Sequence, residues 1–428
     1  MARFVEVSVS YPIPHNWKWD SIGNYAKIKS GYPFDSEKFS DDPTGRQPLI
    51  RIRDILREST NTFTDECCPE EYIIHAGDIL IGMDGDFNVG KWNGDDALLN
   101  QRVCYIQSNS NCLLNDYLYY YLPGILKIIN NATPSVTVKH LSANTLRKTQ
   151  IPLPPLAEQQ RIVDRIESLF AKLDEAKEKA QAVVDSFETR KAAILHKAFT
   201  GELTAKWREE HGVGMESWGK KSVGELCISL KYGTAKKSDA SGNVVVLRMG
   251  NLQQGEIDWS DLAYSNDPDD IEKYKLFPGD VLFNRTNSAA LVGKTAIYRG
   301  EHPAIYAGYL IKLDYDHDKI IGDYLNYALN TLDAKKYCNS VKTDGVNQSN
   351  INAKKIGAYS FNVPSIPEQE KIVSVIQKLL SKEQQAKEAA EAVLDQIELM
   401  KKSILARAFR GELGTNDPSE ESAVELLR

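Results

Sequence analysis

Several signals that mark common classes of protein are missing from this chain of 428 residues. No stretch approaches the roughly 18 uninterrupted apolar residues that a membrane-spanning helix needs. Near the N-terminus, Glu6 stands where a secretion signal would have its apolar centre. We therefore expect a cytoplasmic protein that does not associate with membranes.

Cysteine and histidine are few, and neither shows the spacing of a metal site. The chain has 6 cysteines and 7 histidines, with no CxxC pair, no histidine at zinc-finger distance and no HExxH. Thiols without such spacing are typical of a reducing compartment. The Asp/Asn-Pro-Pro-aromatic motif of an amino-methyltransferase and a glycine-rich cofactor loop are also missing. We therefore expect no catalytic site, and no cofactor or metal bound by the chain itself.

One stretch, LVGKTA at 291–296, ends like a phosphate-binding loop. That pattern requires glycine five residues before Gly293, and the chain has Ser288 there. The letters VGK recur at 89–91 without the threonine. We interpret both stretches as parts of strands or loops.

Proline is missing from two long segments, between Pro155 and Pro268 and between Pro367 and Pro418. Within both segments apolar residues recur with alternating spacings of four and three, which is the heptad pattern of a coiled coil. Each predicted helix has about 40 residues and a length of ~60 Å at 1.5 Å per residue. We expect the two helices to pack on each other, antiparallel. The alternative is that each helix packs only on its own domain.

The predicted seam takes one apolar residue from each helical turn. In the first helix it comprises Ile166, Leu169, Leu173, Ala176, Ala180, Val183 and Phe187. In the second helix it comprises Ile376, Leu379, Ala386, Ala390, Val393 and Ile397, and continues to Met400.

The two helical segments are copies of one unit. Residues 151–203 and 361–413 align without a gap at an offset of 210 residues, with 24 of 53 positions identical. Weaker similarity continues upstream, where YIIHAGDILI at 72–81 parallels YKLFPGDVLF at 274–283. A repeat of about 200 residues indicates a duplicated domain and not a solenoid.

Local signals predict how these helices begin and end. Ser365 and Glu368 have the spacing of a capping box, with Pro367 in the first turn. Gly201 and Gly411 stand where C-terminal caps are expected. The regions upstream of the helices mix short β-branched or aromatic runs with helical runs, an α+β pattern.

The net charge of −7 argues at first against a nucleic-acid partner. However, residues 1–150 carry 15 basic and 18 acidic side chains, and residues 211–360 carry 18 of each. The remaining acidic excess lies in the helical segments and in residues 414–428. A local basic surface can bind phosphate even when the whole chain is acidic.

The arrangement resembles the specificity subunit of type I restriction–modification systems. The resemblance rests on PLPPLAEQQRIV and its echo VPSIPEQEKIV, on AFTGEL and AFRGEL at the helix ends, and on the GDIL/GDVL and VGK landmarks. The second copy departs to Pro-Ser-Ile-Pro-Glu-Gln. The resemblance covers nearly the whole chain.

The resemblance implies an α+β fold with two tandem target recognition domains and two long helices packed as an antiparallel coiled coil with pseudo-two-fold symmetry. It assigns 1–150 and 211–360 to the recognition domains, 151–210 and 361–413 to the helical regions, and 414–428 to an acidic tail. Each recognition domain would read one half of a split, asymmetric site on double-stranded DNA. The coiled coil would set the spacer and dock methyltransferase subunits.

The resemblance also implies the partners and their cofactors. Two methyltransferase subunits would bind S-adenosylmethionine, and restriction–translocase subunits would bind ATP and Mg²⁺. The specificity subunit itself would catalyse nothing.

Candidate DNA contacts are polar residues in loops that follow strands, because arginine pairs with guanine and Asn or Gln with adenine in the major groove. Taken singly, such a residue is more often a surface or phosphate contact than a base reader. In the first domain the candidates are Arg51, Arg53, Lys91, Gln101, Arg102, Lys139 and His140. In the second they are Arg248, Asn284, Arg285, Thr286, Asn287, Lys294, Lys342, Asn347 and Gln348.

Two other functions remain open at this point. One is the specificity subunit of a type IIB-like enzyme that cuts on both sides of its site. The other is a coiled-coil scaffold whose globular ends bind proteins and not DNA. Duplicated domains with unlike loops favour the reading of two unlike DNA sequences.

Overall fold

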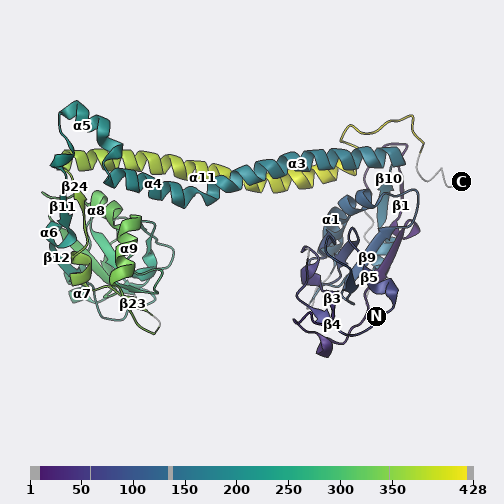
Figure 1. The fold of residues 1–428 in the computed structure, drawn as a ribbon, viewed down its shortest axis with the longest axis horizontal. Coiled ribbons are helices and arrows are strands. Elements are labelled where there is room, and N and C mark those ends of the chain that lie inside the picture. The colour runs from purple at the N-terminus through teal and green to yellow at the C-terminus, as the bar shows by residue number, and fades with distance from the viewer. Residues whose placement is uncertain (1–9, 58, 134–137, 347, 422–428) are drawn as a thin grey trace. The chain divides into compact units, whose positions relative to one another are not determined.

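The computed structural model describes residues 10–57, 59–133, 138–346 and 348–421 (Figure 1). The chain forms two compact units. The first unit contains Met1–Ala180 and Ala392–Arg428, and the second contains Gln181–Glu391. In the described part of the chain, no helix has the length and apolar character to cross a membrane.

The first unit is an α+β domain. Its strands are β1 (Lys18–Ser21), β2 (Ala26–Ser30), β3 (Gln47–Ile50), β4 (Phe63–Thr64), β5 (Ile73–Ile74), β6 (Ile79–Gly82), β7 (Val89–Lys91), β8 (Ala97–Leu99), β9 (Val103–Ser108) and β10 (Gln150–Leu153). Its short helices are α1 (Asn115–Ala132) and α2 (Ala143–Lys148). One four-stranded sheet has the order β2-β9-β6-β7, a second has β4-β3-β8-β5, and β1 pairs with β10.

The second unit repeats this plan. Its strands are β11 (Gly219–Ser222), β12 (Cys227–Tyr232), β13 (Val244–Leu247), β14 (Leu252–Gln253), β15 (Glu256–Ile257), β16 (Tyr264–Ser265), β17 (Val281–Asn284), β18 (Thr286–Asn287), β19 (Thr295–Ile297), β20 (Ala304–Tyr306), β21 (Leu310–Tyr315), β22 (Thr343–Asp344), β23 (Ser349–Asn350) and β24 (Ser360–Val363). Its short helices are α5 (Ala205–His211), α6 (Val223–Leu226), α7 (Pro268–Tyr274), α8 (Gly322–Leu329), α9 (Leu332–Val341) and α10 (Ala353–Gly357).

The sheets of the second unit match those of the first in order and direction. The sheet β12-β21-β17-β19 corresponds to β2-β9-β6-β7, and β11 with β24 corresponds to β1 with β10. The strand triple β16-β13-β20 corresponds to β4-β3-β8, with the same mixture of an antiparallel and a parallel pair. A further sheet, β18-β23-β22, joins two segments distant in sequence.

The VGK landmark is not a structural equivalence. In the first unit Val89 pairs with Ile81 of β6, and in the second Thr295 pairs with Phe283 of β17. Because β6 and β17 carry the parallel GDIL and GDVL stretches, Val89 corresponds to Thr295 and not to Val292. The first VGK is therefore strand β7, whereas the second lies in the loop before β19.

Long helices connect these elements, and one of them is interrupted. The second repeat forms a single helix, α11 (Ile366–Ala408), as predicted. The first repeat forms α3 (Leu156–Asp185) and α4 (Phe187–Phe199), which are separated at Ser186. The Ser186 hydroxyl donates a hydrogen bond to the carbonyl of Ala182, and such back-bonding bends helices. The expectation of one unbroken first helix was wrong. Gly201 and Gly411 have φ values of 83° and 73°, which confirms the predicted caps.

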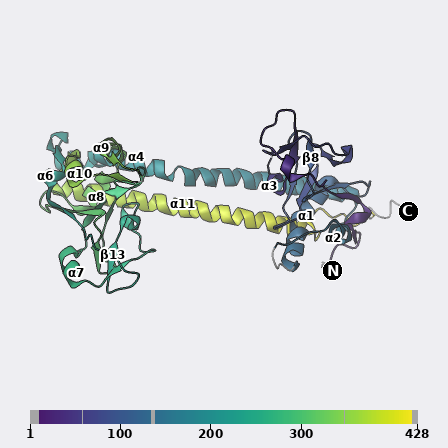
Figure 2. The same ribbon diagram turned by 90° about the horizontal axis from the view of Figure 1, so that it is seen from below.

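Within each unit the helices run antiparallel. In the first unit Lys177 of α3 pairs with Glu398 of α11 at 2.8 Å, and Asp174 pairs with Lys401 at 2.5 Å. From Lys177 to Asp174 on α3, the partner changes from Glu398 to Lys401 on α11, so the two helices run in opposite directions. In the second unit Arg190 of α4 pairs with Glu383 at 2.5 Å. Figure 2 shows α3 and α4 lying alongside α11.

The structure corrects part of the predicted seam. The first-helix residues of the seam are buried or half-buried, but Ala386, Val393 and Met400 of α11 are exposed. The residue after each of them turns inward instead. Two of these residues are lysines, Lys387 and Lys401, whose ammonium groups lie 5.1 Å and 5.0 Å from aromatic ring centres on the facing helix. The aliphatic stem of a lysine covers apolar surface while its charge reaches water. A prediction based on apolar residue types does not consider lysine for the seam and therefore selects the apolar residue before it.

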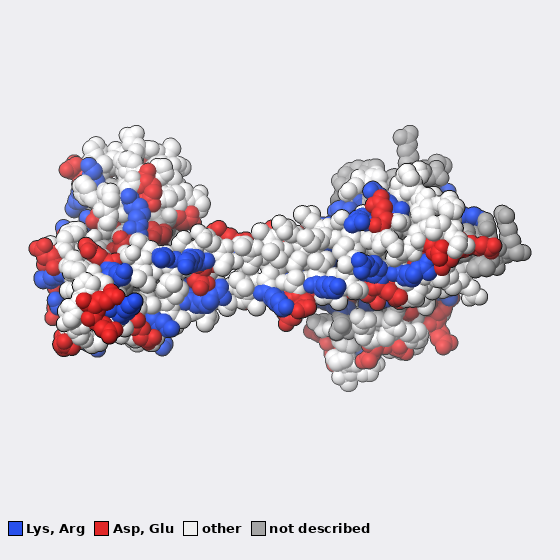
Figure 3. All heavy atoms as spheres, turned by 90° about the horizontal axis from the view of Figure 1, so that it is seen from above, with Lys and Arg blue, Asp and Glu red and all other residues white. Residues whose placement is uncertain are grey.

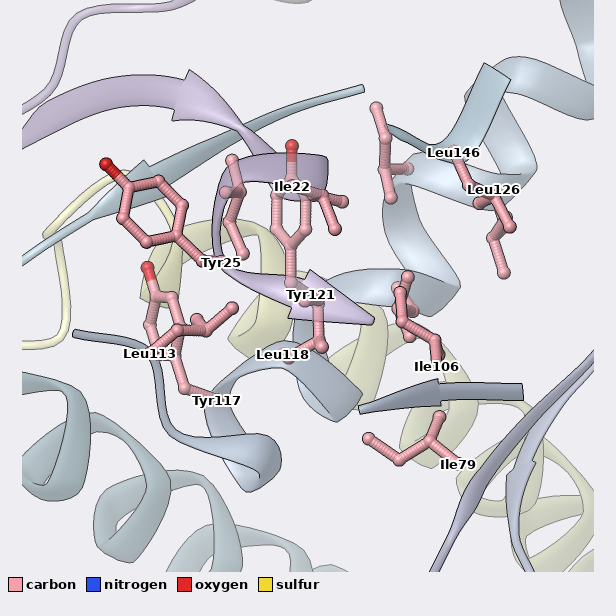
Figure 4. Close-up of a cluster of buried hydrophobic side chains, with 14 of the residues drawn as sticks. Ile22, Tyr25, Ile79, Ile106, Leu113, Tyr117, Leu118, Tyr121, Leu126 and Leu146 are labelled. Atoms are coloured by element: carbon pink, nitrogen blue, oxygen red, sulfur yellow. The ribbon is translucent and has the colours of Figure 1, made fainter. Parts of the chain in front are cut away.

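The end of each helical repeat completes the core of the other repeat's domain. Phe409, after α11, packs 5.1 Å from the rings of Tyr117 and Tyr121 of α1. Phe199, 210 residues earlier, packs 4.8 Å from Tyr324 of α8. Figure 4 shows Tyr117 and Tyr121 within the buried cluster of the first unit, beside Ile22 and Leu118.

Candidate nucleic-acid interface

A glutamine at the start of each long helix positions the domain beneath it. The side chain of Gln159 accepts from the backbone N–H of Leu114 and donates to the carbonyl oxygens of Cys112 and Pro154. Gln369 makes the same three bonds in the second unit, with Ile321, Lys319 and Pro364. The bonds are 2.8–3.1 Å long and both glutamines are fully buried. The glutamine of the repeated Glu-Gln motif therefore joins each helix to its domain through hydrogen bonds.

Among the described residues, the donors to the neighbouring glutamate of the first unit are neutral groups. Glu158 receives the indole N–H of Trp17 at 2.9 Å and the side-chain amide of Asn416 at 3.0 Å. Burial raises the pKa of this carboxyl, and the hydrogen bonds from Trp17 and Asn416 oppose the rise. Part of the predicted acidic tail thus folds onto the first domain, and Glu420 binds Arg161 through two bonds of 2.8–2.9 Å.

The equivalent glutamate of the second unit binds a buried cation. Glu368 receives the indole N–H of Trp218 at 2.9 Å, the hydroxyl of Thr204 at 2.7 Å and the guanidinium of Arg208 at 2.7 Å. Its side chain is 1% exposed and that of Arg208 is 9% exposed. The predicted capping box between Ser365 and Glu368 is therefore wrong. The carboxylate instead binds side chains that are distant in sequence, which a rule based on local spacing cannot predict.

Four of the first-domain candidates lie together around one hollow. Arg51 and Arg53 follow β3, and Gln101 and Arg102 precede β9; all four line a hollow of about 530 Å³. The Arg51 guanidinium lies 5.7 Å from the ring centre of Phe39. Because β3 and β8 are parallel neighbours, the loops that follow them lie at one sheet edge. The hollow therefore presents arginine and amide groups from two adjacent loops.

His140 joins this cluster through an acid. Asp84, after β6, lies 2.7 Å from Nδ1 of His140 and 3.3 Å from the guanidinium of Arg102. Lys139 is directed elsewhere, because its ammonium donates to the carbonyl and side-chain oxygens of Asn130 at 2.7 Å and 3.1 Å. Lys139 thus supports the end of α1.

Lys91 does not belong to the hollow. It lies in β7, and its ammonium pairs with Asp116 in the first turn of α1 and lies 5.0 Å from the ring centre of Tyr119. The corresponding acid of the second unit, Asp323, pairs with Arg299 after β19 at 2.7 Å. We interpret Lys91 as a strand-to-helix tie.

In the second domain the small sheet β18-β23-β22 brings two predicted stretches together. Thr286 pairs with Asn350 and Asn287 with Ser349, so the segments NRTNS and GVNQSN lie side by side. The Asn350 amide donates to the hydroxyl of Thr286 at 2.8 Å. In the first unit the equivalent position holds the single bridge between Asp84 and His140.

Arg285 lies beside this sheet and is held by a ring contact and two hydrogen bonds. Its guanidinium lies 4.8 Å from the ring centre of Tyr232 and donates to Gly308 and Asn350 at 3.3 Å and 3.2 Å. Its Nε has no partner in the described structure. Tyr309, adjacent to Gly308, is 51% exposed. The second domain thus presents a stacked arginine with exposed aromatic side chains.

Arg51 and Arg248 hold equivalent positions. Each follows an interior strand, and its backbone N–H donates to a side chain three residues later, Asp54 at 3.0 Å or Asn251 at 2.8 Å. Arg248 differs because its guanidinium also pairs with Asp261 at 3.0 Å.

The remaining second-domain candidates have other surroundings than Arg285. Asn284 is fully buried, so it cannot touch a base without rearrangement, and its amide nitrogen has no partner among the described residues. Lys294 donates to Gln253 at 2.8 Å. Lys342 pairs with Asp344 at 2.8 Å, and Gln348 is exposed beside them. Asn347 lies outside the described residues.

Sequence reasoning missed several residues of these surfaces. Asn88 and Asn100 line the first hollow, and Tyr232 and Tyr309 flank Arg285. A structural alignment of the repeats points to these aromatic residues, since Gly308 and Tyr309 occupy the positions of Gln101 and Arg102. The signal in the sequence is weak because the two loops, 100–102 and 307–309, have equal length but no residue in common.

Charged residues of both signs occur together on one face of the molecule. On the face in Figure 3, Lys and Arg are interspersed with Asp and Glu. Within the described ranges, no group of three or more His, Cys, Asp and Glu side chains could hold a metal ion. The candidate DNA contacts of both domains lie in their polar loops.

The chain contains two copies of an α+β domain, and each copy is joined to the paired helices by the same glutamine. The polar loops of the two copies differ. These features define a protein with two binding modules. The chain belongs to the family described as type I restriction modification DNA specificity domain, which matches residues 14–184 and 215–393.

Relatives extend over nearly the whole chain. The type I restriction enzyme EcoBI specificity subunit of Escherichia coli is 30% identical over 417 residues, which cover 94% of this chain and 87% of the relative. The EcoKI specificity subunit of Escherichia coli strain K12 is 27% identical and covers 94% of this chain and 90% of the relative. These relatives support the type I assignment over the type IIB-like and scaffold alternatives.

Solved structures share the fold. The HsdS subunit from Thermoanaerobacter tengcongensis has a TM-score of 0.59 at 19% identity and covers 94% of this chain and 99% of its own. A chain from a structure on complex assembly and conformational transition of the type I R-M system has a TM-score of 0.71 at 18% identity, with coverage of 94% and 100%. At these identities the likeness concerns the fold.

Proposed function

We propose that this chain is the DNA-recognition subunit of a type I restriction–modification complex, and that each α+β domain reads one half of a bipartite, asymmetric site. We assign the reading to residues 1–150 and 211–360. One observation carries the proposal: the two domains place unlike side chains at equivalent loop positions. Gln101 and Arg102 stand where the second domain has Gly308 and Tyr309. Unlike side chains in equivalent loops select unlike bases.

The partners follow from the family. Two adenine methyltransferase subunits with S-adenosylmethionine would dock on the helices, and restriction–translocase subunits with ATP and Mg²⁺ would complete the complex in the cytoplasm. This chain would bind no cofactor of its own. Alone it should neither methylate nor cut DNA, and methyl transfer by the purified chain, free of partner, would contradict this.

Base reading is proposed for the groups that the hollow and the small sheet present. Arg51, Arg53 and Arg102 can each donate two hydrogen bonds to the major-groove edge of guanine, and Gln101 suits adenine. In the second domain Arg285 and Asn287 have the corresponding chemistry. A good bidentate contact contributes about 1–3 kcal/mol of discrimination.

Single substitutions test the assignment of each half. We expect Arg51→Ala, in a complex with the methyltransferase, to relax one position of one half-site, and Arg285→Ala to relax the other half-site. Methylation mapping of genomic DNA measures both. Arg46→Ala is the control, because Arg46 belongs to the first domain, pairs with Asp42 and lies outside the hollow. Loss of both half-sites with either variant would contradict separate reading.

The spacer provides a second test. Four residues inserted into one long helix add about 6 Å at 1.5 Å per residue. That corresponds to roughly two base pairs at ~3.4 Å each. We expect a wider unread gap with the same bases in each half-site. A changed half-site with an unchanged gap would exclude the helices as the ruler.

A further inference from the structure

A second hollow, in the second unit, carries unbalanced positive charge. It has a volume of about 400 Å³ and lies between α4, the turn that joins β14 to β15, the loop at 290–294 and α9. Its charged lining residues are Lys191, Lys294, Lys335 and Glu188. Three lysines and one glutamate thus line the hollow. We call this site the lysine hollow.

None of the three lysines has a carboxylate partner within the described part of the chain. Lys191 donates to the carbonyl and side-chain oxygens of Gln254 at 3.3 Å and 2.9 Å, and Lys294 donates to the side-chain oxygen of Gln253 at 2.8 Å. An amide oxygen accepts a hydrogen bond but carries no net charge. Within the described residues, neither ammonium group therefore has a carboxylate at ion-pair distance, and Glu188 and Glu256 act on Lys191 only from farther away.

The repeated helix supplies an internal comparison. Lys401, 210 residues after Lys191, occupies the same position in the first unit and pairs with Asp174 at 2.5 Å. The residue that corresponds to Asp174 in the second repeat is Gln384, which donates to Glu388. The second repeat has thus replaced the counter-ion by a neutral amide. Lys191 turns instead toward Gln254.

The arrangement is electrostatically unfavourable when it is empty of anions. Burial lowers the pKa of the Lys191 ammonium, and the charge of Lys335 lowers it further, against the opposing effects of Glu188 and Glu256. Gln254 also has φ of 55°, in the left-handed region that a non-glycine residue adopts at a cost. That turn carries the two glutamine side chains which hold Lys191 and Lys294 in place.

We propose that the lysine hollow binds a phosphate group. A water molecule occupies about 30 Å³ of liquid, so 400 Å³ accommodates a phosphate together with solvent. The group comes either from the backbone of the duplex that the second domain reads or from a free phosphate compound. The first source rests on the proposed function, and the second does not.

The duplex source is tested through the salt dependence of binding. Each phosphate contact contributes about 0.9 to the slope of log K against log salt concentration. We expect Lys191→Gln, in the full complex with the methyltransferase and a non-specific duplex, to lower that slope by about 0.9. Lys401→Gln is the matched control, because it removes the same charge from an existing ion pair and should leave the slope unchanged.

Wild-type protein tests both sources without a substitution. Lysines are acylated in the absence and presence of duplex, inorganic phosphate or pyrophosphate, and the modified sites are mapped by mass spectrometry. We expect protection of Lys191, Lys294 and Lys335 but not of Lys401. Protection by duplex together with a lower slope identifies backbone phosphate. Protection by phosphate or pyrophosphate with an unchanged slope identifies a free phosphate compound.

Two outcomes separate this inference from the proposed function. If neither duplex nor phosphate protects the three lysines and the slope is unchanged, the lysine hollow is not a phosphate site. If the wild-type complex fails to bind duplex at all, the proposed function is wrong. Protection by inorganic phosphate or pyrophosphate would in that case still establish the lysine hollow.

Discussion

The two units fasten their helices with the same glutamine but neutralise the neighbouring glutamate in different ways. In the first unit Glu158 meets an indole, an amide and a hydroxyl, all neutral. In the second unit Glu368 meets the buried guanidinium of Arg208. A repeat thus preserves the bonds that hold the fold, while the residues around a buried charge diverge. The following predictions measure how far that divergence changes the energetics.

The largest difference in stability is expected between the variants Glu368→Gln and Glu158→Gln, with Glu368→Gln the more destabilised. Removal of one partner from a buried ion pair costs about 3–5 kcal/mol, because the remaining charge is left uncompensated. Glutamine at 158 can still accept from Trp17 and loses only about 1 kcal/mol. Hydrogen exchange at 201–208 and at 411–420 in the full chain reports each network separately. Equal loss of protection in both segments would show that Arg208 is not a buried counter-charge.

For the two tryptophans we expect the opposite order, with the larger loss of stability in the first unit. Trp17→Phe removes an indole donor from a carboxylate that has no buried cation, and hydrogen bonds to charged groups contribute about 1.5–3 kcal/mol. Trp218→Phe should cost less, because Arg208 and Thr204 still bind Glu368. Urea titration, followed by hydrogen exchange near each site, measures the two losses. A larger effect at Trp218 would contradict the comparison.

Ion pairs between the helices should contribute less. Lys177 and Glu398 are 48% and 53% exposed, and exposed pairs contribute about 0.2–1 kcal/mol. Arg190 and Glu383 are 33% and 26% exposed, and Arg190 also donates to the carbonyl of Val183. We expect a larger coupling for the second pair in double-mutant cycles with alanine. The ranking fails if the Lys177 pair is the stronger one.

The smallest expected effect is a change in pH dependence confined to the first unit. Burial raises the pKa of Glu158, so the folded unit binds its proton more tightly than the unfolded chain does. The contribution of this carboxyl to stability therefore falls as pH rises from its unfolded pKa, about 4.3, through its raised folded pKa, and is constant above that. Protection of 411–420 against exchange, compared between wild type and Glu158→Gln, measures the difference. Parallel pH profiles would contradict the assignment.

Local patterns in the sequence predicted the secondary-structure elements better than they predicted which residues each side chain contacts. The duplication, the helix of 366–408 and the caps at Gly201 and Gly411 follow from identity, proline spacing and glycine chemistry. The capping box of Glu368 failed because a carboxylate 164 residues from Thr204 is a tertiary feature. The seam of α11 failed at three positions, and at two of them the reason is that lysine stems cover the apolar surface.

The candidate site divides in the same way. The polar loop segments could be selected from composition, and NRTNS and GVNQSN do lie side by side. Their roles could not be assigned, because Lys91, Lys139, Asn284 and Arg51 meet the same criterion of a polar loop residue, and their surroundings in the fold distinguish them. Asn284 is fully buried, whereas Arg51 lines an open hollow. Exposure of a side chain depends on strands that are distant in sequence.

The sequence by itself determined the duplicated domains, the long helices, the α+β class and the family of this protein, since each leaves a periodic or repeated pattern in the chain. The tertiary structure alone decided which charges have an ion-pair partner. Among the described residues, Lys401 pairs with Asp174, whereas Lys191 donates to Gln254 and pairs with no carboxylate. The two lysines occupy equivalent positions in the repeat, but whether a charge is neutralised depends on partners about 60 to 230 residues away, which only folding brings within reach.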